Sequence, residues 1–150
     1  MNVMDYIAAE SERQSANRSE YFGMIGAYNH ALHQYRLNAG IDETLIKSLS
    51  ALITGNAEYR RVPAVFNQGV PAVDAHLIPR AMGHLVDAMN LPMVEQKDGW
   101  SVSYLDVVIG EFLAIHPFAD GNGRVASLLY NFLNDSLDDP VQLPYYYGNQ

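Results

Sequence analysis

The chain has 150 residues and a mass of 16.7 kDa, which suffices for one domain with a buried core but not for two full-sized domains. Hydrophobic residues make up 49% of the chain, which excludes a disordered protein, and the 17 acidic against 9 basic residues argue against nucleic acid or an anionic membrane as a partner. The absence of cysteine excludes a disulfide scaffold, a thiol nucleophile and any cysteine-ligated metal site.

The sequence shows no division into parts and no targeting signal. Residues 1–13 carry no charged-then-apolar signal pattern, and no apolar run approaches the roughly 20 residues that span a bilayer. The simplest expectation is a cytoplasmic protein, with delivery into another cell by a machine that reads a different signal left open. Because no repeat, low-complexity tract or linker interrupts the chain, we expect a single domain over residues 1–150.

Five segments repeat apolar side chains at three- and four-residue spacing, which predicts an all-α fold. The first predicted helix covers residues 16–38 and stops at Gly40, and the second begins at the capping residue Asp42 and ends at Gly55. Between residues 59 and 73 apolar residues alternate with polar or small ones, and two prolines exclude a helix interior. We therefore expect one small, exposed β-hairpin there.

The second half of the chain is predicted to hold three more helices, whose limits follow from capping residues and prolines. They are a third helix over residues 74–89, capped by Asp74 and followed by a loop over 90–99; a fourth that begins at Ser101 or Ser103 and ends before Pro117; and a buried fifth over 122–137.

The link between the fourth and fifth helices concentrates the residues that carry chemistry. Residues 120–123 read Asp-Gly-Asn-Gly at a helix start, where glycines let a ligand approach the main chain and successive N–H groups converge on one anion. Arg124 adds a cation whose fork suits phosphate oxygens, and Asp120 adds the carboxylate that Mg²⁺ takes beside substrate phosphates. His116 can accept a proton at neutral pH. The pattern indicates phosphoryl or nucleotidyl transfer, and the simpler alternative is a glycine-rich helix–helix turn with a histidine cap.

These residues also resemble the Fic (filamentation induced by cyclic AMP) family, whose motif reads His-x-Phe-x-Asp/Glu-Gly-Asn-Gly-Arg-x-x-Arg. Ser127 stands where that motif ends in arginine, and the resemblance covers roughly residues 40–137. The other seven fixed positions match: His116, Phe118, Asp120, Gly121, Asn122, Gly123 and Arg124.

The resemblance implies a Fic-type helical domain that transfers AMP from ATP, with Mg²⁺, to a hydroxyl side chain of another protein. The flap, which begins at Arg61 and ends at Val70, would dock that target protein as an added strand. The implied roles are a general base for His116, a magnesium ligand for Asp120, an anion hole for Gly121, Asn122 and Gly123, a contact to the β-phosphate for Arg124 and a structural anchor for Phe118.

Ser127 leaves three alternatives open, because in relatives the arginine at this position grips the terminal phosphate of ATP. Loss of a charge-assisted hydrogen bond, worth roughly 1.5–3 kcal/mol, would weaken the use of ATP without abolishing the chemistry. The chain is then a slow adenylyltransferase, a transferase whose donor lacks a γ-phosphate, or a nucleotide-binding module without turnover. An example of the second is transfer of phosphocholine from a diphosphate donor. His116, Asp120 and Arg124 together favour retained transfer.

Two further features bear on regulation and binding. The inhibitory motif of the family, Ser/Thr-x-x-x-Glu-Gly/Asn, is absent, so restraint would come from a separate inhibitory partner, as in a toxin–antitoxin pair, or from low intrinsic activity. The cluster Tyr59-Arg60-Arg61 is open to two interpretations, which are contact with nucleotide or an acidic target and ordinary solvation of the flap.

Overall fold

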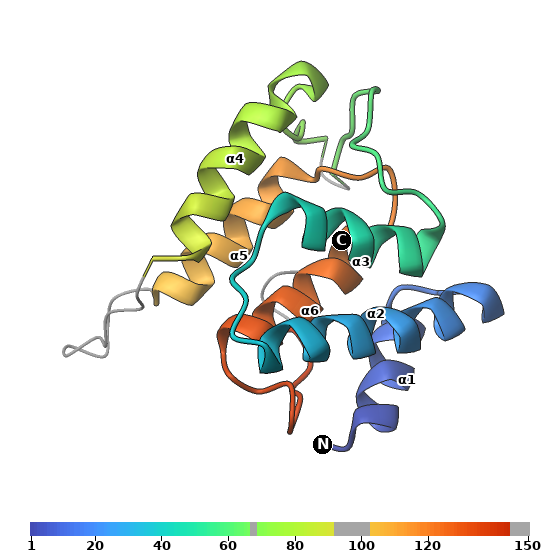
Figure 1. Cartoon of the computed structure of the whole chain (residues 1–150). Helices are drawn as coiled ribbons and strands as arrows, with labels where there is room; N and C mark the ends of the chain where they lie inside the picture. Colours follow the sequence, from blue (N-terminus) through green and yellow to red (C-terminus); the bar gives the residue numbers. More distant parts are fainter. Residues whose placement is uncertain (67–68, 92–102, 145–150) are drawn as a thin grey trace.

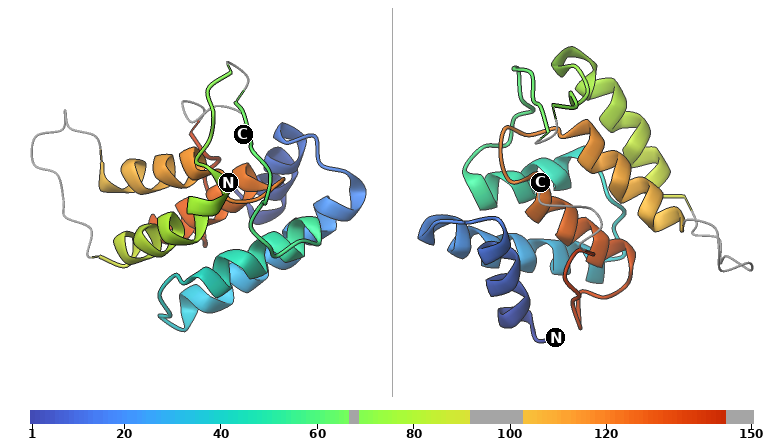
Figure 2. Two further views of the ribbon diagram at one scale, coloured as in Figure 1. Left: turned by 90° about the horizontal axis from the view of Figure 1, so that it is seen from above. Right: turned by 180° about the vertical axis from the view of Figure 1, so that it is seen from behind.

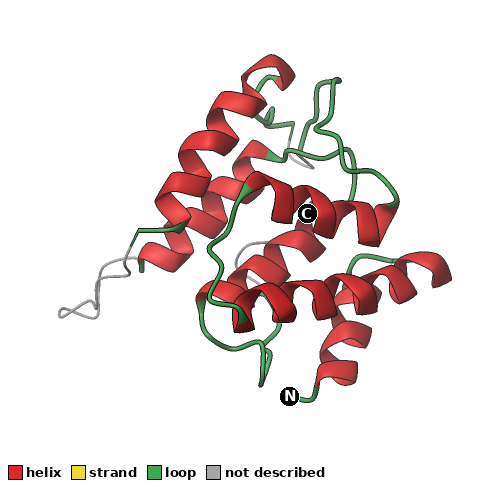
Figure 3. Cartoon of the chain, viewed as in Figure 1, coloured by secondary structure: helices red, strands yellow, loops and turns green. Residues whose placement is uncertain are grey.

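The regular secondary structure is helical throughout the part of the chain described by the computed structural model, which comprises residues 1–66, 69–91 and 103–144 (Figures 1 and 3). No strand longer than an isolated bridge is assigned within these residues. The helices are α1 (Val3–Arg13), α2 (Arg18–Arg36), α3 (Glu43–Thr54), the short 3₁₀ helix η1 (Ala75–Leu77), α4 (Ile78–Met89), α5 (Tyr104–Ile115) and α6 (Asn122–Leu133).

Helix α6 forms the centre of the fold, as its apolar pattern predicts. It packs against α1, α2, α3 and α5, and ten of its twelve residues are buried. Around it the helices run in pairs, with α2 alongside α3 and α4 alongside α5 (Figure 2). The first turn of α6, which carries residues 122–124, is therefore surrounded by protein on several sides. None of the helices in the described ranges is both long and apolar enough to cross a membrane.

Two predicted helix starts are confirmed by capping hydrogen bonds. The side chain of Asp42 accepts a bond from the N–H of Leu45 at 2.7 Å, and Ser103, one of the two starts considered for α5, caps that helix. Helix α2, expected from residue 16, begins instead at Arg18 with a reciprocal capping box of Asn17 and Glu20 that was not predicted. Ser101, the other start considered for α5, lies outside the described residues, as does most of the expected loop over 90–99.

Helix α1 is an element that the sequence pattern does not predict. It begins after the capping residue Asn2 and buries Tyr6, Ile7, Glu10 and Ser11. Because two of these four inward side chains are polar, the segment has no apolar stripe to reveal it. The core of the fold therefore begins earlier in the chain than the apolar periodicity suggests.

Three predicted helix boundaries are wrong, and local backbone geometry explains each. The side chain of Asp74 makes no capping bond; its main-chain carbonyl instead accepts from Leu77 and starts the 3₁₀ turn. The helix predicted to reach residue 137 ends at Leu133, because Asp135 adopts a left-handed φ of 55° that reverses the chain. The helix expected to stop at Gly40 ends at Arg36, and the left-handed residue after it is Asn38, with φ 56°.

The expected hairpin is present as a narrow loop that rises above α3 (Figure 1). Its two legs are joined by an antiparallel bridge between Val65 and Pro71 and by a hydrogen bond from the N–H of Ala72 to the carbonyl of Ala64 at 2.9 Å. Val65 is 64% exposed, so this hairpin presents its edge to solvent. We call the hairpin with both of its legs, residues 61–73, the flap, which is longer than the range from Arg61 to Val70 that the family resemblance implies. The turn residues Asn67 and Gln68 lie outside the described residues.

Candidate functional site

The loop between α5 and α6 is held in one shape by a side chain from its own helix. Asn122, which is 1% exposed, accepts a hydrogen bond from the N–H of Phe118 at 2.9 Å and donates to the carbonyl of Phe118 at 2.8 Å. The ring of Phe118 is buried and packs against Tyr59. The side chain of Asn122 is thus committed to the loop, so any anion that it helps to bind must be met by its main-chain N–H.

Two glycines let the start of α6 pass close to its neighbours. Gly121 adopts a left-handed φ of 83°, and a Cβ placed there would lie 2.7 Å from Cγ2 of Thr54. A Cβ on Gly123 would lie 2.7 Å from Nε2 of Gln14. No side chain of the described residues caps α6, so its first N–H groups can meet an anion, as at phosphate sites on other helix N-termini.

Arg124 is a buried cation with spare hydrogen-bonding capacity. The residue is 1% exposed, and its Nε and Nη1 have no hydrogen-bond partner within the described part of the chain. Nη2 lies 3.6 Å from a carboxylate oxygen of Glu20 and 3.6 Å from one of Asp120. Because a buried guanidinium is costly unless it is paired, these orphaned nitrogens fit an anionic group such as a phosphate.

Asp120 faces outward at the edge of the same site. Its side chain is 69% exposed, and Oδ1 accepts a hydrogen bond from the N–H of Gly121 at 2.8 Å. No group of three or more His, Asp or Glu side chains that could hold a metal exists among the described residues. A Mg²⁺ ion here would therefore take Asp120 as its protein ligand and complete its shell with water and substrate phosphates, a donor set that suits this ion.

His116 lies at the C-terminal end of α5, where it adopts a left-handed conformation with φ 52°. Burial lowers the pKa of this half-buried imidazole, and the positive charge of Arg60 lowers it further, while the Leu113 carbonyl and the charge of Asp120 act in the opposite direction. The ring of Phe66, on the flap, meets the imidazole edge to face with centroids 5.4 Å apart. The net effect lowers the pKa and so favours the neutral imidazole, the form that can accept a proton.

Ser127, which stands where the family motif has its second arginine, is covered by α1. Ser127 is 0% exposed, and its hydroxyl lies 2.5 Å from the hydroxyl of Tyr6. Beside them Glu10 is also buried; its Oε1 accepts from the N–H of Leu143, while its Oε2 lacks a partner among the described residues. Burial raises the pKa of Glu10. A polar cluster inside the core therefore occupies the side of α6 where the family motif would end.

The structure brings all of the predicted site residues to one end of α6 and adds three that the sequence did not single out for this role. Gln14, in the link between α1 and α2, lies against Gly123, and Glu20, in the first turn of α2, faces Arg124, so these two segments cover the start of α6. Arg60 neither is solvated nor faces a nucleotide or an acidic target, the two roles considered for its cluster. It is 5% exposed and donates hydrogen bonds to main-chain carbonyls. No local signal reveals these contacts, since they join segments far apart in the sequence.

Comparison with known proteins agrees with this geometry. The model of the Fic/DOC family matches residues 30–133, a span that contains the whole of the loop and of α6. Comparison with curated proteins gave no match.

Two solved structures show the same fold. A Fic domain containing signaling protein from Bacteroides thetaiotaomicron is similar with a TM-score of 0.64 and 25% identity, over 77% of this chain and 47% of that chain. Fic-1 from C. elegans is similar with a TM-score of 0.59 and 23% identity, over 85% of this chain and 39% of that chain, a likeness that concerns the fold alone. The present chain thus spans less than half the length of either protein.

Proposed function

The chain belongs to the Fic/DOC family, and we propose that it is a protein adenylyltransferase, which moves AMP from ATP to a hydroxyl side chain of a target protein. The single observation that carries this proposal is the meeting of a neutral histidine, a bare helix N-terminus and a buried arginine with orphaned nitrogens at one end of α6. A general base beside a phosphate cradle suits attack by a hydroxyl on a phosphorus atom.

In the proposed reaction, His116 takes the proton of the target hydroxyl while the hydroxyl oxygen forms a bond to the α-phosphorus of ATP. The bond from that phosphorus to the bridging oxygen breaks, and pyrophosphate leaves with the electron pair. Arg124 and the first N–H groups of α6 hold the phosphate oxygens and neutralise the charge that develops on the leaving group. Asp120 would hold Mg²⁺, which supplies additional positive charge against the phosphates when bound.

The flap is proposed to present the target. Its exposed edge includes Val62, Val65 and Val70, which are 61%, 64% and 54% exposed. An extended segment of the target could pair with this edge through main-chain hydrogen bonds. Such pairing requires the segment to be extended but does not require a particular sequence. Phe66 at His116 brings the flap close to the base, as such docking requires.

The environment of Ser127 supports a second candidate. Because Ser127 is fully buried against Tyr6, its hydroxyl is not available to hold a third phosphate. A transferase whose donor lacks a γ-phosphate, or a module that binds nucleotide without turnover, would need no such contact. We also propose a separate inhibitory partner protein. Such a partner could restrain the protein whether it is an adenylyltransferase or the second candidate.

Mass spectrometry of the protein and of a cell lysate, after incubation with Mg²⁺ and either ATP, UTP, GTP or CDP-choline, tests the proposal. The wild type should add the mass of a nucleotidyl group with ATP, and His116→Ala should lower that yield by about 10²- to 10⁴-fold, the usual contribution of a general base. His33→Ala, an exposed histidine on α2, is the matched control and should behave as the wild type. Modification with CDP-choline alone would favour the second candidate, and nucleotide binding without any product would contradict an enzyme.

A further inference from the structure

Arg60 donates hydrogen bonds to four main-chain carbonyls. Its Nε reaches the carbonyl of His116 at 2.6 Å, its Nη1 reaches that of Val62 at 2.9 Å, and its Nη2 reaches that of Ile115 at 3.0 Å. Nη2 also donates to the carbonyl of Val73. The N–H of Arg60 itself donates to the carbonyl of Pro117 at 2.8 Å.

These acceptors belong to three separate segments. Val62 stands at the start of the outgoing leg of the flap, and Val73 stands at the end of the returning leg. Ile115 and His116 form the C-terminal end of α5, where carbonyls lack partners within the helix and carry partial negative charge. One guanidinium therefore joins both legs of the flap to the residue proposed as the base.

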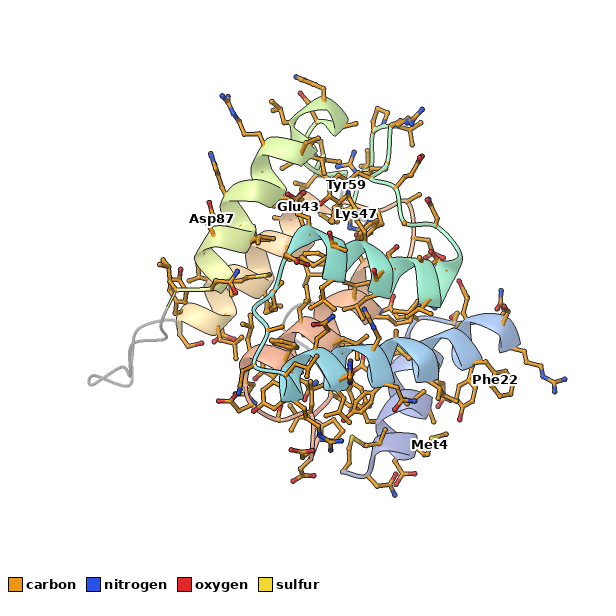
Figure 4. The ribbon with its side chains drawn as sticks, viewed as in Figure 1. Met4, Phe22, Glu43, Lys47, Tyr59 and Asp87 are labelled. Atoms are coloured by element: carbon orange, nitrogen blue, oxygen red, sulfur yellow. The ribbon has the colours of Figure 1, made fainter. Side chains whose placement is uncertain are left out.

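The chemistry of the side chain explains why this joint needs arginine. The guanidinium is a rigid fork with five donors, whereas a lysine ammonium is a single point with three, so only arginine can meet four carbonyls in different directions. Arg60 is 5% exposed, and a buried cation is tolerated where its hydrogen bonds are made. The neighbouring residue Tyr59 donates a hydrogen bond to Glu43 at 2.5 Å, and Nζ of Lys47 lies 4.5 Å from the centre of its ring; Figure 4 labels these three residues.

The hydrogen bonds of Arg60 act on a residue with an uncommon backbone conformation. A left-handed conformation such as that of His116, with φ 52°, is seldom adopted by residues other than glycine and persists where surrounding contacts fix it. The bonds from Arg60 to the carbonyls of Ile115 and His116 are such contacts, and the ring contact from Phe66 adds a third from the flap.

We propose that Arg60 is a positioning residue, which fixes the orientation of His116 and the position of the flap relative to α5. One side chain would then place the base and the docked target next to each other. This inference rests on the proposed function for its catalytic consequence, but its structural part stands on the hydrogen bonds alone. The nucleotide cradle should be independent of Arg60, because the loop before α6 is pinned by Asn122.

The test compares Arg60→Gln and Arg60→Lys with Arg36→Gln, a control at an exposed arginine that pairs with Asp138 at the end of α2. Amide hydrogen exchange is measured first, because it does not depend on activity. Arg60→Gln should speed exchange at least tenfold in the flap legs and in residues 115–118 but leave α2 and α3 as in the wild type, and Arg60→Lys should show a smaller effect in the same segments. Unchanged exchange, or a uniform increase along the chain, would overturn the proposal, and Arg60→Lys carries the comparison if Arg60→Gln does not fold.

Kinetics then separate positioning from a general loss of structure. With ATP and a modified target identified by mass spectrometry, Arg60→Gln should lower kcat by about ten- to a hundredfold, as expected for a displaced base, and raise the KM for the target. The affinity for nucleotide should stay within twofold of the wild type, and Arg60→Lys should recover part of kcat. A parallel loss of nucleotide affinity would mean that Arg60 is only structural. If no variant, including the wild type, forms product, the proposed function fails while the exchange result still decides the role of Arg60.

Discussion

Arg124 is a positive charge held almost wholly inside the protein, with only loose ionic partners. The separations of 3.6 Å from its Nη2 to Glu20 and to Asp120 exceed ordinary hydrogen-bond length. A buried charge in this situation gains from any anion that can reach it. In the proposed function, Glu20 in the first turn of α2 would therefore compete with a nucleotide phosphate for the same guanidinium.

The substitution Glu20→Gln should raise the affinity for ATP by about fivefold, corresponding to ~1 kcal/mol for a partly buried ion pair. Glutamine keeps the capping box with Asn17, because its carbonyl oxygen can still accept the Asn17 N–H, so α2 should retain its start. Isothermal titration calorimetry with ATP and Mg²⁺ measures the change.

Asp87→Asn is the control for Glu20→Gln, since it removes one negative charge from an exposed position on α4, far from Glu20 along the chain (Figure 4). It should leave the affinity unchanged. An equal gain in both variants would show that the net charge of the protein, and not the contact with Arg124, governs nucleotide binding.

At the scale of elements, the loop between α5 and α6 owes its shape to one amide side chain and not to its glycines alone. Gly121 permits the tight turn, but Asn122 pairs with both main-chain groups of Phe118 and so closes the loop on itself. The flap is fixed to the other side of this loop through Arg60. The end of α6 that carries the motif is thus fixed by neighbouring residues and covered by elements from earlier in the chain.

Asn122→Ala should lower the free energy of unfolding by about 2–3 kcal/mol, because it removes two buried hydrogen bonds and leaves the N–H and carbonyl of Phe118 without partners. Urea unfolding followed by circular dichroism gives the value. The corresponding change at the other end of the helix, Asn134→Ala, removes an exposed side chain and should cost only a few tenths of a kcal/mol. Equal costs would mean that the bonds to Phe118 do not hold the loop.

At the scale of the whole molecule, the two ends of the described chain are joined through α1. The N-terminal amine lies 2.7 Å from a carboxylate oxygen of Asp139, and Arg13 donates to the carbonyl of Leu143 at 2.6 Å. Glu10 accepts from the N–H of the same Leu143, inside the core. Helix α1 therefore clamps the segment after α6 and seals the polar cluster around Ser127.

Glu10→Gln should stabilise the protein at neutral pH and have little effect near pH 4. Burial raises the pKa of Glu10 above its ordinary value of 4.5, so as the pH rises past that value the unfolded chain releases its proton first and the folded state loses stability. Glutamine does not titrate, and it keeps an acceptor for Leu143. The gain at pH 7 should be about 1–2 kcal/mol, or several degrees in Tm.

Thermal unfolding at several pH values measures this effect, with Glu12→Gln, an exposed glutamate on the same helix, as the control. The gap between Glu10→Gln and the wild type should open as the pH rises above 4.5 and level off once Glu10 is ionised in the folded protein as well. A gap that is the same at pH 4 and pH 7 would show that ionisation of Glu10 is not its cause.

Features that depend on a few consecutive residues were predictable from the sequence, because caps, turns and the glycine-rich loop act within one or two turns of chain. These features are the cap at Asp42, a start of α5 at Ser101 or Ser103, and a hairpin between residues 59 and 73, which the structure shows as a loop closed by a single bridge. The all-α fold followed from the spacing of apolar residues, and the family match and the solved relatives confirm it. Helix α1 escaped prediction because its inward face is half polar.

The surroundings of the motif depend on long-range packing. The hydroxyl of Tyr6 meets Ser127 across 121 positions of sequence, and Arg60 reaches Ile115 across 55, so no local pattern could announce either contact. Each depends on how α1 and the flap pack against α5 and α6, which is settled by the burial of the whole core at once. The residues of the proposed chemistry therefore lie in one short stretch of sequence. The contacts that cover the start of α6, hold His116 and bury Ser127 come from distant segments that folding brings together.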